Sequence, residues 1–425
     1  MSIIELGEVR DGTVPEPSGR RPPAVGRPLR CAAVLLLALI VLAGATPLAR
    51  RTVIPVPAAP RATAYLSAGG VFVVDPSTPT EDRHLTAYAL PAANGDVRRR
   101  WQMPLPGAGN SSGFVGARVE RGLVLLTEMN TDDGVWETVA FDASTGGQRW
   151  RLAGFPSWTA DGGLLLNAFG EGSGAVSRVA PDTGLVLWSV PVPTGGYVSY
   201  HGDDVVDRFV LFRQNGEVQV HDATSGRLLR SVDTLPGDRS ESQQQHVAGE
   251  LVLLLGADRT RLEAYGLSEL DRRWTAELPG LAFAARCGDL LCAFKETGGI
   301  AVLDPATGAV RWAATGEQGI GVVRADRLLT SGLDRRQIVR ELATGRVVAE
   351  LGRWDVLPRV RPDDPLIGVR PGSDGRLVVA ELDLAAGRSR IIDMLPRGTN
   401  NCQASSWDLL CARLDGSTAL FRLRP

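Results

Sequence analysis

The chain has 425 residues, with 46 basic and 48 acidic side chains and a formal net charge of −2 at neutral pH. A chain so close to neutrality offers no basic surface for a phosphate backbone, so no nucleic-acid partner is predicted. The length beyond the N-terminal segment is ample for one large continuous fold.

The first predicted element is an apolar segment at Cys31–Ala49, which contains no charged residue and follows an arginine-rich stretch. About twenty apolar residues span a bilayer, and the arginine-rich side stays in the cytoplasm. We therefore predict a transmembrane signal anchor at 31–49 and a disordered cytoplasmic tail at 1–30. A cleaved signal peptide ending near Ala43–Ala45 is the alternative. Either reading predicts that the rest of the chain lies outside the cytoplasm.

Residues 50–63 contain three prolines, Pro55, Pro57 and Pro60. Proline-rich segments are extended and act as spacers. This segment is therefore predicted to be a linker between the membrane and a folded domain at 64–425.

The folded domain repeats one phrase. The nonapeptide Asp142–Trp150 recurs at Asp304–Trp312 with the same Asp, Thr, Gly, Arg and Trp spacing. Weaker copies occur at intervals of 37–51 residues, with the turn position at Gly95, Gly146, Gly184, Gly226, Leu270, Gly308, Gly345 and Gly387. A period near forty with several short strands per repeat predicts an all-β propeller with one blade per repeat.

Each repeat is predicted to form four strands. In the sixth repeat these are Leu281–Arg286, Asp289–Phe294, Ile300–Leu303 and a strand that begins with Ala309–Trp312. Eight blades are the preferred count, with seven or nine as alternatives. The C-terminal segment Cys402–Leu423 matches the start of the sixth repeat but stops before a fourth strand. It is predicted to complete a blade together with N-terminal strands, because ring closure removes open sheet edges.

The repeated phrase combines a turn with a packing residue. An Asp side chain accepts hydrogen bonds from amides one or two residues further on, and Gly adopts the positive φ that the corner requires. The tryptophan four residues later is predicted to wedge between blades. The residues with these structural turn and docking roles are Asp142, Gly146, Trp150, Gly184, Trp188, Gly226, Trp274, Asp304, Gly308 and Trp312.

This phrase resembles the pyrroloquinoline-quinone-like (PQQ-like) propeller repeat, which has the pattern A-x-D-x-x-T-G-x-x-x-W. The resemblance implies the propeller fold over 64–425 and leaves the activity open. Some relatives are quinoprotein dehydrogenases that hold the quinone against a disulfide between adjacent cysteines. This chain has no adjacent cysteine pair. No cofactor, metal site or catalytic residue is therefore predicted.

Four cysteines beyond the apolar segment form two close pairs, Cys287/Cys292 and Cys402/Cys411, at matching positions of two repeats. A hairpin with a four-residue loop would place Cys287 opposite Cys292, within disulfide range. Pairing within each hairpin is the prediction, although four cysteines allow three connectivities and free thiols are the alternative.

The variable, polar loops between the second and third strands, and between blades, are predicted to share one rim of the ring. Loops on a rigid scaffold are the usual place for recognition. A mixed-charge binding rim is predicted there, including Asp132, Asp133, Arg335 and Arg336. The leading hypothesis is a membrane-tethered, extracytoplasmic and non-enzymatic module that binds a protein, peptide or cell-envelope ligand. The alternatives are an extracytoplasmic oxidoreductase or hydrolase using the central funnel, and a single-pass sensor.

Overall fold

The computed structural model describes residues 52–60, 62–67, 69–76, 83–91, 95–105, 111–130, 134–169, 174–202, 205–234, 244–361 and 363–423. The predicted tail at 1–30 and the predicted anchor at 31–49 lie outside these residues. In the described part of the chain, no helix has the length and hydropathy needed to cross a bilayer.

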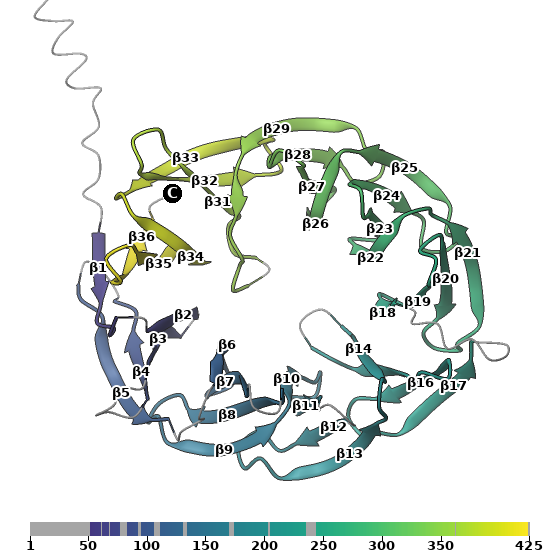
Figure 1. The fold of residues 1–425 in the computed structure, drawn as a ribbon, viewed down its shortest axis with the longest axis horizontal. Coiled ribbons are helices and arrows are strands. Elements are labelled where there is room, and N and C mark those ends of the chain that lie inside the picture. The colour runs from purple at the N-terminus through teal and green to yellow at the C-terminus, as the bar shows by residue number, and fades with distance from the viewer. Residues whose placement is uncertain are drawn as a thin grey trace, which may run out of the picture. The chain divides into compact units, whose positions relative to one another are not determined.

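The described residues from Thr52 onward form nine antiparallel sheets of four strands each, arranged as a ring (Figure 1). The all-β propeller predicted from the repeat is confirmed. The blade count is nine, the highest of the three counts that the sequence allows. The ninth arises because the three C-terminal strands form a separate blade with the first strand of the ring.

The first four blades follow the chain in order. Blade 1 contains β2 (Thr63–Ser67), β3 (Gly70–Asp75), β4 (His84–Ala89) and β5 (Arg98–Pro104). Blade 2 contains β6 (Ser111–Glu120), β7 (Leu123–Asn130), β8 (Trp136–Asp142) and β9 (Gln148–Ala153). Blade 3 contains β10 (Phe155–Trp158), β11 (Leu164–Ala168), β12 (Gly174–Val179) and β13 (Val186–Val192). Blade 4 contains β14 (Tyr197–His201), β15 (Arg208–Phe212), β16 (Glu217–Asp222) and β17 (Leu228–Asp233).

The remaining five blades complete the ring. Blade 5 contains β18 (Gln244–Ala248), β19 (Leu251–Leu255), β20 (Arg261–Gly266) and β21 (Arg272–Glu277). Blade 6 contains β22 (Leu281–Cys287), β23 (Leu290–Lys295), β24 (Gly299–Leu303) and β25 (Val310–Thr315). Blade 7 contains β26 (Glu317–Arg324), β27 (Arg327–Gly332), β28 (Arg336–Glu341) and β29 (Val347–Arg353). Blade 8 contains β30 (Asp355–Val356), β31 (Ile367–Pro371), β32 (Leu377–Asp383) and β33 (Arg388–Leu395). Blade 9 contains β34 (Thr399–Ser405), β35 (Asp408–Arg413), β36 (Thr418–Arg422) and β1 (Thr52–Val56).

The core of the ring lies between the blades. The second and third strands of a blade are covered on both faces, so they are continuous apolar runs; all five residues of β19 and of β24 are buried. The described residues form nine buried hydrophobic clusters, one at each interface between neighbouring blades. Each interface between neighbouring blades is therefore stabilised by a buried cluster of the described residues.

The ring closes through β1, which pairs antiparallel with β36 in the ninth blade (Figure 1). Ile54 and Val56 of β1 are buried, 2 % and 4 % exposed, against residues of the first and ninth blades such as Leu66 and Leu420. The segment predicted as a linker, 50–63, therefore contains a strand of the propeller, and the folded domain begins at Thr52 rather than Ala64. Pro55 is tolerated because β1 is the edge strand of its sheet, where one face of the backbone needs no ladder partner.

Candidate functional site

The repeated turns hold each blade to the next. The five tryptophans at the docking position, one each in blades 1, 2, 3, 5 and 6, donate an indole hydrogen bond of 2.6–3.0 Å to a backbone carbonyl in the following blade. The turn glycine of that following blade lies against the same ring, so that a Cβ atom there would be 2.8 Å or less from the tryptophan. These five tryptophans are Trp101, Trp150, Trp188, Trp274 and Trp312, and the five glycines are Gly146, Gly184, Gly226, Gly308 and Gly345.

One turn position carries leucine instead of glycine, and the structure gives the reason. Leu270 adopts a φ of 55°, the same left-handed region as the turn glycines. The preceding blade, blade 4, has Arg230 where blades 1, 2, 3, 5 and 6 have tryptophan, and the Arg230 side chain pairs with Glu269 at 3.4 Å. Because no indole ring lies against the turn, a Cβ atom at position 270 meets no steric barrier from the previous blade. Glycine is needed in the five turns that face a tryptophan for two reasons: the backbone has a positive φ, and a side chain would overlap the indole ring of the preceding blade.

The turn aspartates are occupied by local hydrogen bonds. Asp142 Oδ1 accepts hydrogen bonds of 2.9 Å from the amides of Ser144 and Thr145, and Oδ2 pairs with Arg149 at 2.6 Å. The Ser144 hydroxyl and then Arg149 lower the pKa of the Asp142 carboxyl. Asp304 makes the same amide contact with Ala306, 2.9 Å, and pairs with Arg311. These carboxylates are turn residues whose acceptors are already used.

Both cysteine pairs are disulfides in the structure. Cys287–Cys292 lies in the hairpin of β22 and β23, with the two Cα atoms 5.7 Å apart. Leu290, not Cys292, faces Cys287 across the hairpin, because the turn has two residues and begins with Gly288 at a φ of 62°. The predicted four-residue loop with directly facing cysteines was therefore wrong. The bridge connects positions that are diagonal across the ladder.

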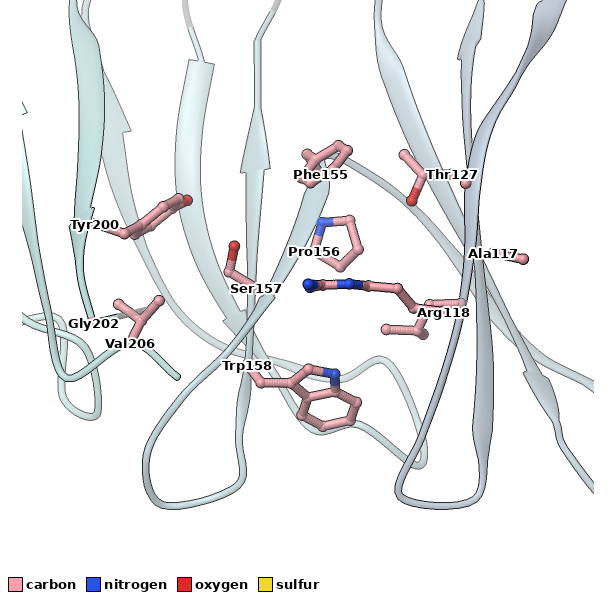
Figure 2. Close-up of a pocket in the computed structure, with 12 residues that line it drawn as sticks. Ala117, Arg118, Thr127, Phe155, Pro156, Ser157, Trp158, Tyr200, Gly202 and Val206 are labelled. Carbon is pink, nitrogen blue, oxygen red and sulfur yellow. The ribbon is translucent and has the colours of Figure 1, made fainter. Parts of the chain in front are cut away.

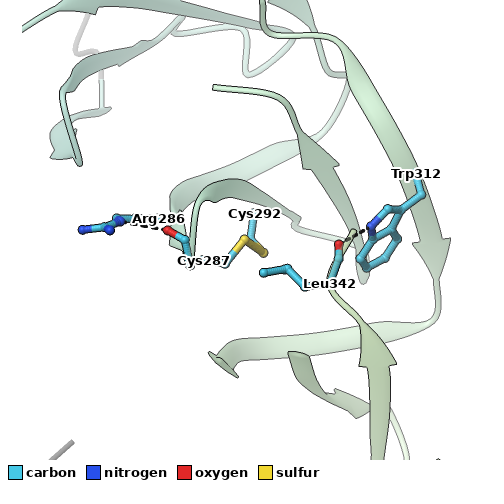
Figure 3. Close-up of a disulfide and its surroundings, with 6 residues drawn as sticks. Arg286, Cys287, Cys292, Trp312 and Leu342 are labelled. Carbon is cyan, nitrogen blue, oxygen red and sulfur yellow. Dashed lines mark hydrogen bonds between the residues drawn. A yellow bond between two sulfur atoms is a disulfide. The ribbon is translucent and has the colours of Figure 1, made fainter. Parts of the chain in front are cut away.

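This disulfide is part of the interface between blades 6 and 7. Leu342 of blade 7 lies beside the two sulfurs, and its carbonyl accepts the hydrogen bond from the Trp312 indole (Figure 3). The second bridge, Cys402–Cys411, connects β34 to β35 with the Cα atoms 4.1 Å apart. It lies in the buried cluster between blades 8 and 9. Each disulfide thus strengthens a hairpin at the point where two blades meet.

Two of the four predicted rim residues can be placed. Asp132 and Asp133 lie outside the described residues. Arg335 is in the turn between β27 and β28, and Arg336 begins β28. Arg335 lines a groove of about 710 Å³ between blades 7 and 8, formed by the turns from β27 to β28 and from β31 to β32 and by the connection from β29 to β30. This is the rim on which the variable loops were predicted to lie.

The groove has a mixed-charge wall. Arg335 pairs with Asp355 at 3.2 Å, and the side chains are 75 % and 52 % exposed. Arg353 pairs with Asp334 at 3.4 Å, and both side chains are also largely exposed. Pairs this exposed contribute little to stability and are available for exchange with a partner's charges.

Its floor is aromatic and cationic. Trp354 is 3 % exposed and donates its indole hydrogen bond to the carbonyl of Leu351 at 2.7 Å. The guanidinium of Arg370 lies over this ring, 4.4 Å from the centroid, and no carboxylate of the described residues pairs with it. Met394, 38 % exposed, adds an apolar side chain to the wall. The groove therefore offers a cation, an apolar contact and exchangeable ion pairs.

The sequence located the loops of this groove but not its floor. Trp354 does not belong to the repeated phrase, and nothing in its local sequence relates it to Arg370. The signal that was available is the arginine density near the turns of the last repeats, at Arg335, Arg336, Arg353 and Arg370. Among the described residues, no group of three or more His, Cys, Asp or Glu side chains is positioned to hold a metal ion.

The fold defines the class of protein, a β-propeller of nine four-stranded blades in the described residues. A family model described as outer membrane protein assembly factor BamB matches residues 172–328, from the third blade to the seventh. The resemblance to the PQQ-like repeat is thereby confirmed. No curated protein matches the chain in sequence.

Three of the solved structures that match this chain are the following. BamB from Moraxella catarrhalis is 16 % identical, covering 87 % of this chain and 99 % of its own, with a TM-score of 0.41. The computationally designed Ika8 protein is 15 % identical, covering 74 % of this chain and 97 % of its own, with a TM-score of 0.49. Quinohemoprotein alcohol dehydrogenase from Comamonas testosteroni is 16 % identical, covering 65 % of this chain and 62 % of its own, with a TM-score of 0.38. No activity is assigned from these likenesses.

Proposed function

We propose that the propeller is a non-enzymatic binding module that presents the groove between blades 7 and 8 to a protein partner. The observation that carries this proposal is the composition of the groove, in which Arg370 has no carboxylate partner among the described residues and rests on Trp354 beside the exposed Met394. Arginine, tryptophan and methionine are enriched at protein interfaces. The match to a family model described as an outer membrane protein assembly factor supports a role in protein assembly.

We further propose that the ring works outside the cytoplasm, tethered by the apolar segment at 31–49. Two disulfides support an oxidising compartment, since such bonds are rare in cytosolic proteins. An alkaline phosphatase fusion after Arg61 is expected to be active and membrane-bound, whereas a fusion after Gly19 is expected to be inactive. Activity of the first fusion in the soluble fraction would instead favour the cleaved signal peptide, and an inactive first fusion would contradict export.

Site-specific photocrosslinking in intact cells tests the binding surface. A photoreactive residue at Ser373, an exposed position in the groove, is expected to form a discrete adduct with one envelope protein. The same residue at Thr145, an exposed position in the turn between β8 and β9, is the matched control and is expected to give no such adduct. Charge reversal by Arg335→Glu together with Arg370→Glu should abolish the Ser373 adduct. Adducts that form equally at both positions, or that survive the charge reversal, would contradict the proposal.

A further inference from the structure

A second cavity lies at the inner edge of the ring, away from the groove between blades 7 and 8. It has a volume of about 420 Å³ and is walled by the innermost strands of blades 2, 3 and 4, which are β6, β10 and β14 (Figures 1 and 2). A volume in this range accommodates a small organic molecule. No acidic side chain of the described residues lines it.

The base of the cavity contains a hydrogen-bond donor without an acceptor. Trp158 is 2 % exposed, and its indole nitrogen has no hydrogen-bond partner in the described structure. The five docking tryptophans, in contrast, all donate to a carbonyl of the next blade. In Figure 2 the edge of the Trp158 ring that carries this nitrogen is turned toward Arg118. A buried donor left unpaired is costly, and an acceptor atom in the cavity would remove that cost.

Arg118 supplies a cation at the same place. In each of the nine blades, one residue of the first strand pairs with the third residue of the second strand. In blade 2 this residue is Arg118, opposite Leu125. Seven of the other eight equivalent residues carry no permanent charge, and the eighth, Asp355 of blade 8, is an anion. The seven are Tyr65, Pro156, Ser199, His246, Ala285, Val322 and Gln403. No carboxylate of the described residues pairs with Arg118. A second guanidinium, that of Arg121, lies 5.0 Å from the centroid of the Trp158 ring.

The other walls combine hydroxyl donors with apolar surface. Burial raises the pKa of the Tyr200 phenol, so this hydroxyl remains protonated and can donate. The Ser157 hydroxyl lies between Tyr200 and Arg118 in the view of Figure 2. Phe155 and Val206 are apolar contacts on opposite sides of the cavity. The site therefore combines a planar guanidinium, an indole N–H and hydroxyls with an apolar wall.

We propose that this cavity binds a carboxylate that carries an adjacent apolar group. The two guanidinium N–H vectors of an arginine match the two oxygens of a carboxylate, and the Trp158 N–H can donate to the same group. The apolar wall formed by Phe155, Pro156 and Val206 would hold the attached hydrocarbon. This chemistry is shared by a free organic acid and by the C-terminus of a polypeptide.

Calorimetric titration of the full-length protein tests the proposal and separates the two sources. The probes are N-acetyl-L-phenylalanine, its neutral amide, the peptide Gly-Ser-Ala-Phe with a free C-terminus, and inorganic phosphate. We expect the free acid to bind with a dissociation constant of about 0.1 mM, and the amide to bind at least tenfold more weakly. Tighter binding of the peptide than of the acid would identify a polypeptide C-terminus, and the reverse order would identify a free acid. Absence of binding at about 10 mM, or equal binding of phosphate, would overturn the proposal.

Substitutions identify the contacts. Arg118→Gln is expected to weaken binding of the acid about 100-fold, and Arg118→Lys or Trp158→Phe about tenfold. Arg390→Gln, which alters an exposed ion pair on the outer strand β33, is the matched control and should leave affinity unchanged. Affinity that is unaffected by Arg118→Gln would overturn the assignment.

Thermal denaturation without ligand gives an independent readout. Trp150→Phe removes an indole that donates to the Pro181 carbonyl at 2.6 Å, whereas Trp158→Phe removes an indole that has no acceptor among the described residues. The Trp158 variant should therefore have the higher melting temperature of the two. The opposite order would show that the Trp158 N–H is satisfied within the protein, and would also overturn the proposal.

Discussion

The turn glycines allow two blades to approach closely, because glycine has only a hydrogen atom where other residues have a side chain. Gly308 has a φ of 71°, and a Cβ atom there would lie 2.5 Å from the ring of Trp274 in the preceding blade. Gly316 has nearly the same φ, 75°, but a Cβ atom there would meet nothing within 4 Å. The two positions share the backbone requirement, and only one of them has the ring contact.

Alanine substitution at these two positions separates backbone strain from steric overlap. Gly316→Ala is expected to lower the free energy of unfolding by about 1 kcal/mol, the cost of the left-handed region for a residue with a Cβ. Gly308→Ala should lower it by about 2–4 kcal/mol, because the Trp274 ring must also move. Urea denaturation of both variants measures the difference. Equal losses would show that the ring contact is not a constraint on the turn.

At the scale of the element, β1 determines whether the ring is closed. Its side chains alternate as a half-buried strand requires, with Ile54 2 % and Val53 42 % exposed. Ile54 faces the interface between the ninth and first blades, whereas Val53 faces outward on the same strand.

Aspartate substitution in β1 tests this closure. Ile54→Asp places a carboxylate in the buried cluster and is expected to lower the free energy of unfolding by about 3–5 kcal/mol. Val53→Asp is the control on the same strand and should cost less than about 1 kcal/mol. If both variants were as stable as the unmodified protein, residues 52–56 would be a linker after all.

The stability of the whole molecule is expected to depend on pH through two groups of residues, histidines and carboxylates, which titrate in separate pH ranges. Burial lowers the pKa of His221 and of His246, so these side chains are neutral in the folded protein at a pH where the unfolded chain binds protons. The His221 Nδ1–H donates to the carbonyl of Gly226 at 3.0 Å, and the ring stacks on Phe209. Arg178 lowers the pKa of Asp161 to about 2, so acidic groups of this kind matter only in more acidic solution.

The free energy of unfolding is therefore expected to fall as the pH decreases below the ordinary histidine pKa of 6.5. The contribution of the two histidines is complete above that value and is lost as the pH falls through the lowered pKa of the folded state. A second decrease is expected below pH 3.8, as carboxyls such as Asp161 become protonated. Urea denaturation as a function of pH measures both decreases. His221→Gln combined with His246→Gln should flatten the first decrease and leave the second; an unchanged first slope in this variant would assign it to other groups.

The fold was predictable because the residues that specify it lie close together in the sequence. The Asp-x-x-Thr-Gly turn and the tryptophan four residues later lie within nine residues at Asp142–Trp150, and a phrase repeated near every fortieth residue predicts a propeller. The strands of the sixth repeat were located to within about two residues for the same reason. Trp101 lies two residues later in its repeat than the other docking tryptophans. Its indole still donates a hydrogen bond to the next blade, because a longer connection before β5 compensates for the shift.

By itself, the sequence determined the propeller, its repeat, the turns and the segments that contain its variable loops. Only the tertiary structure decided the count of nine blades and the identity of residues 52–56 as the N-terminal strand that pairs with β36. It alone also showed the two cavities where Arg370 meets Trp354 and where Arg118 faces Trp158. The physical reason is the range of the interactions. Turn chemistry acts between neighbours in the chain, whereas ring closure and site formation depend on side chains from different strands and blades that only the packed ring brings together.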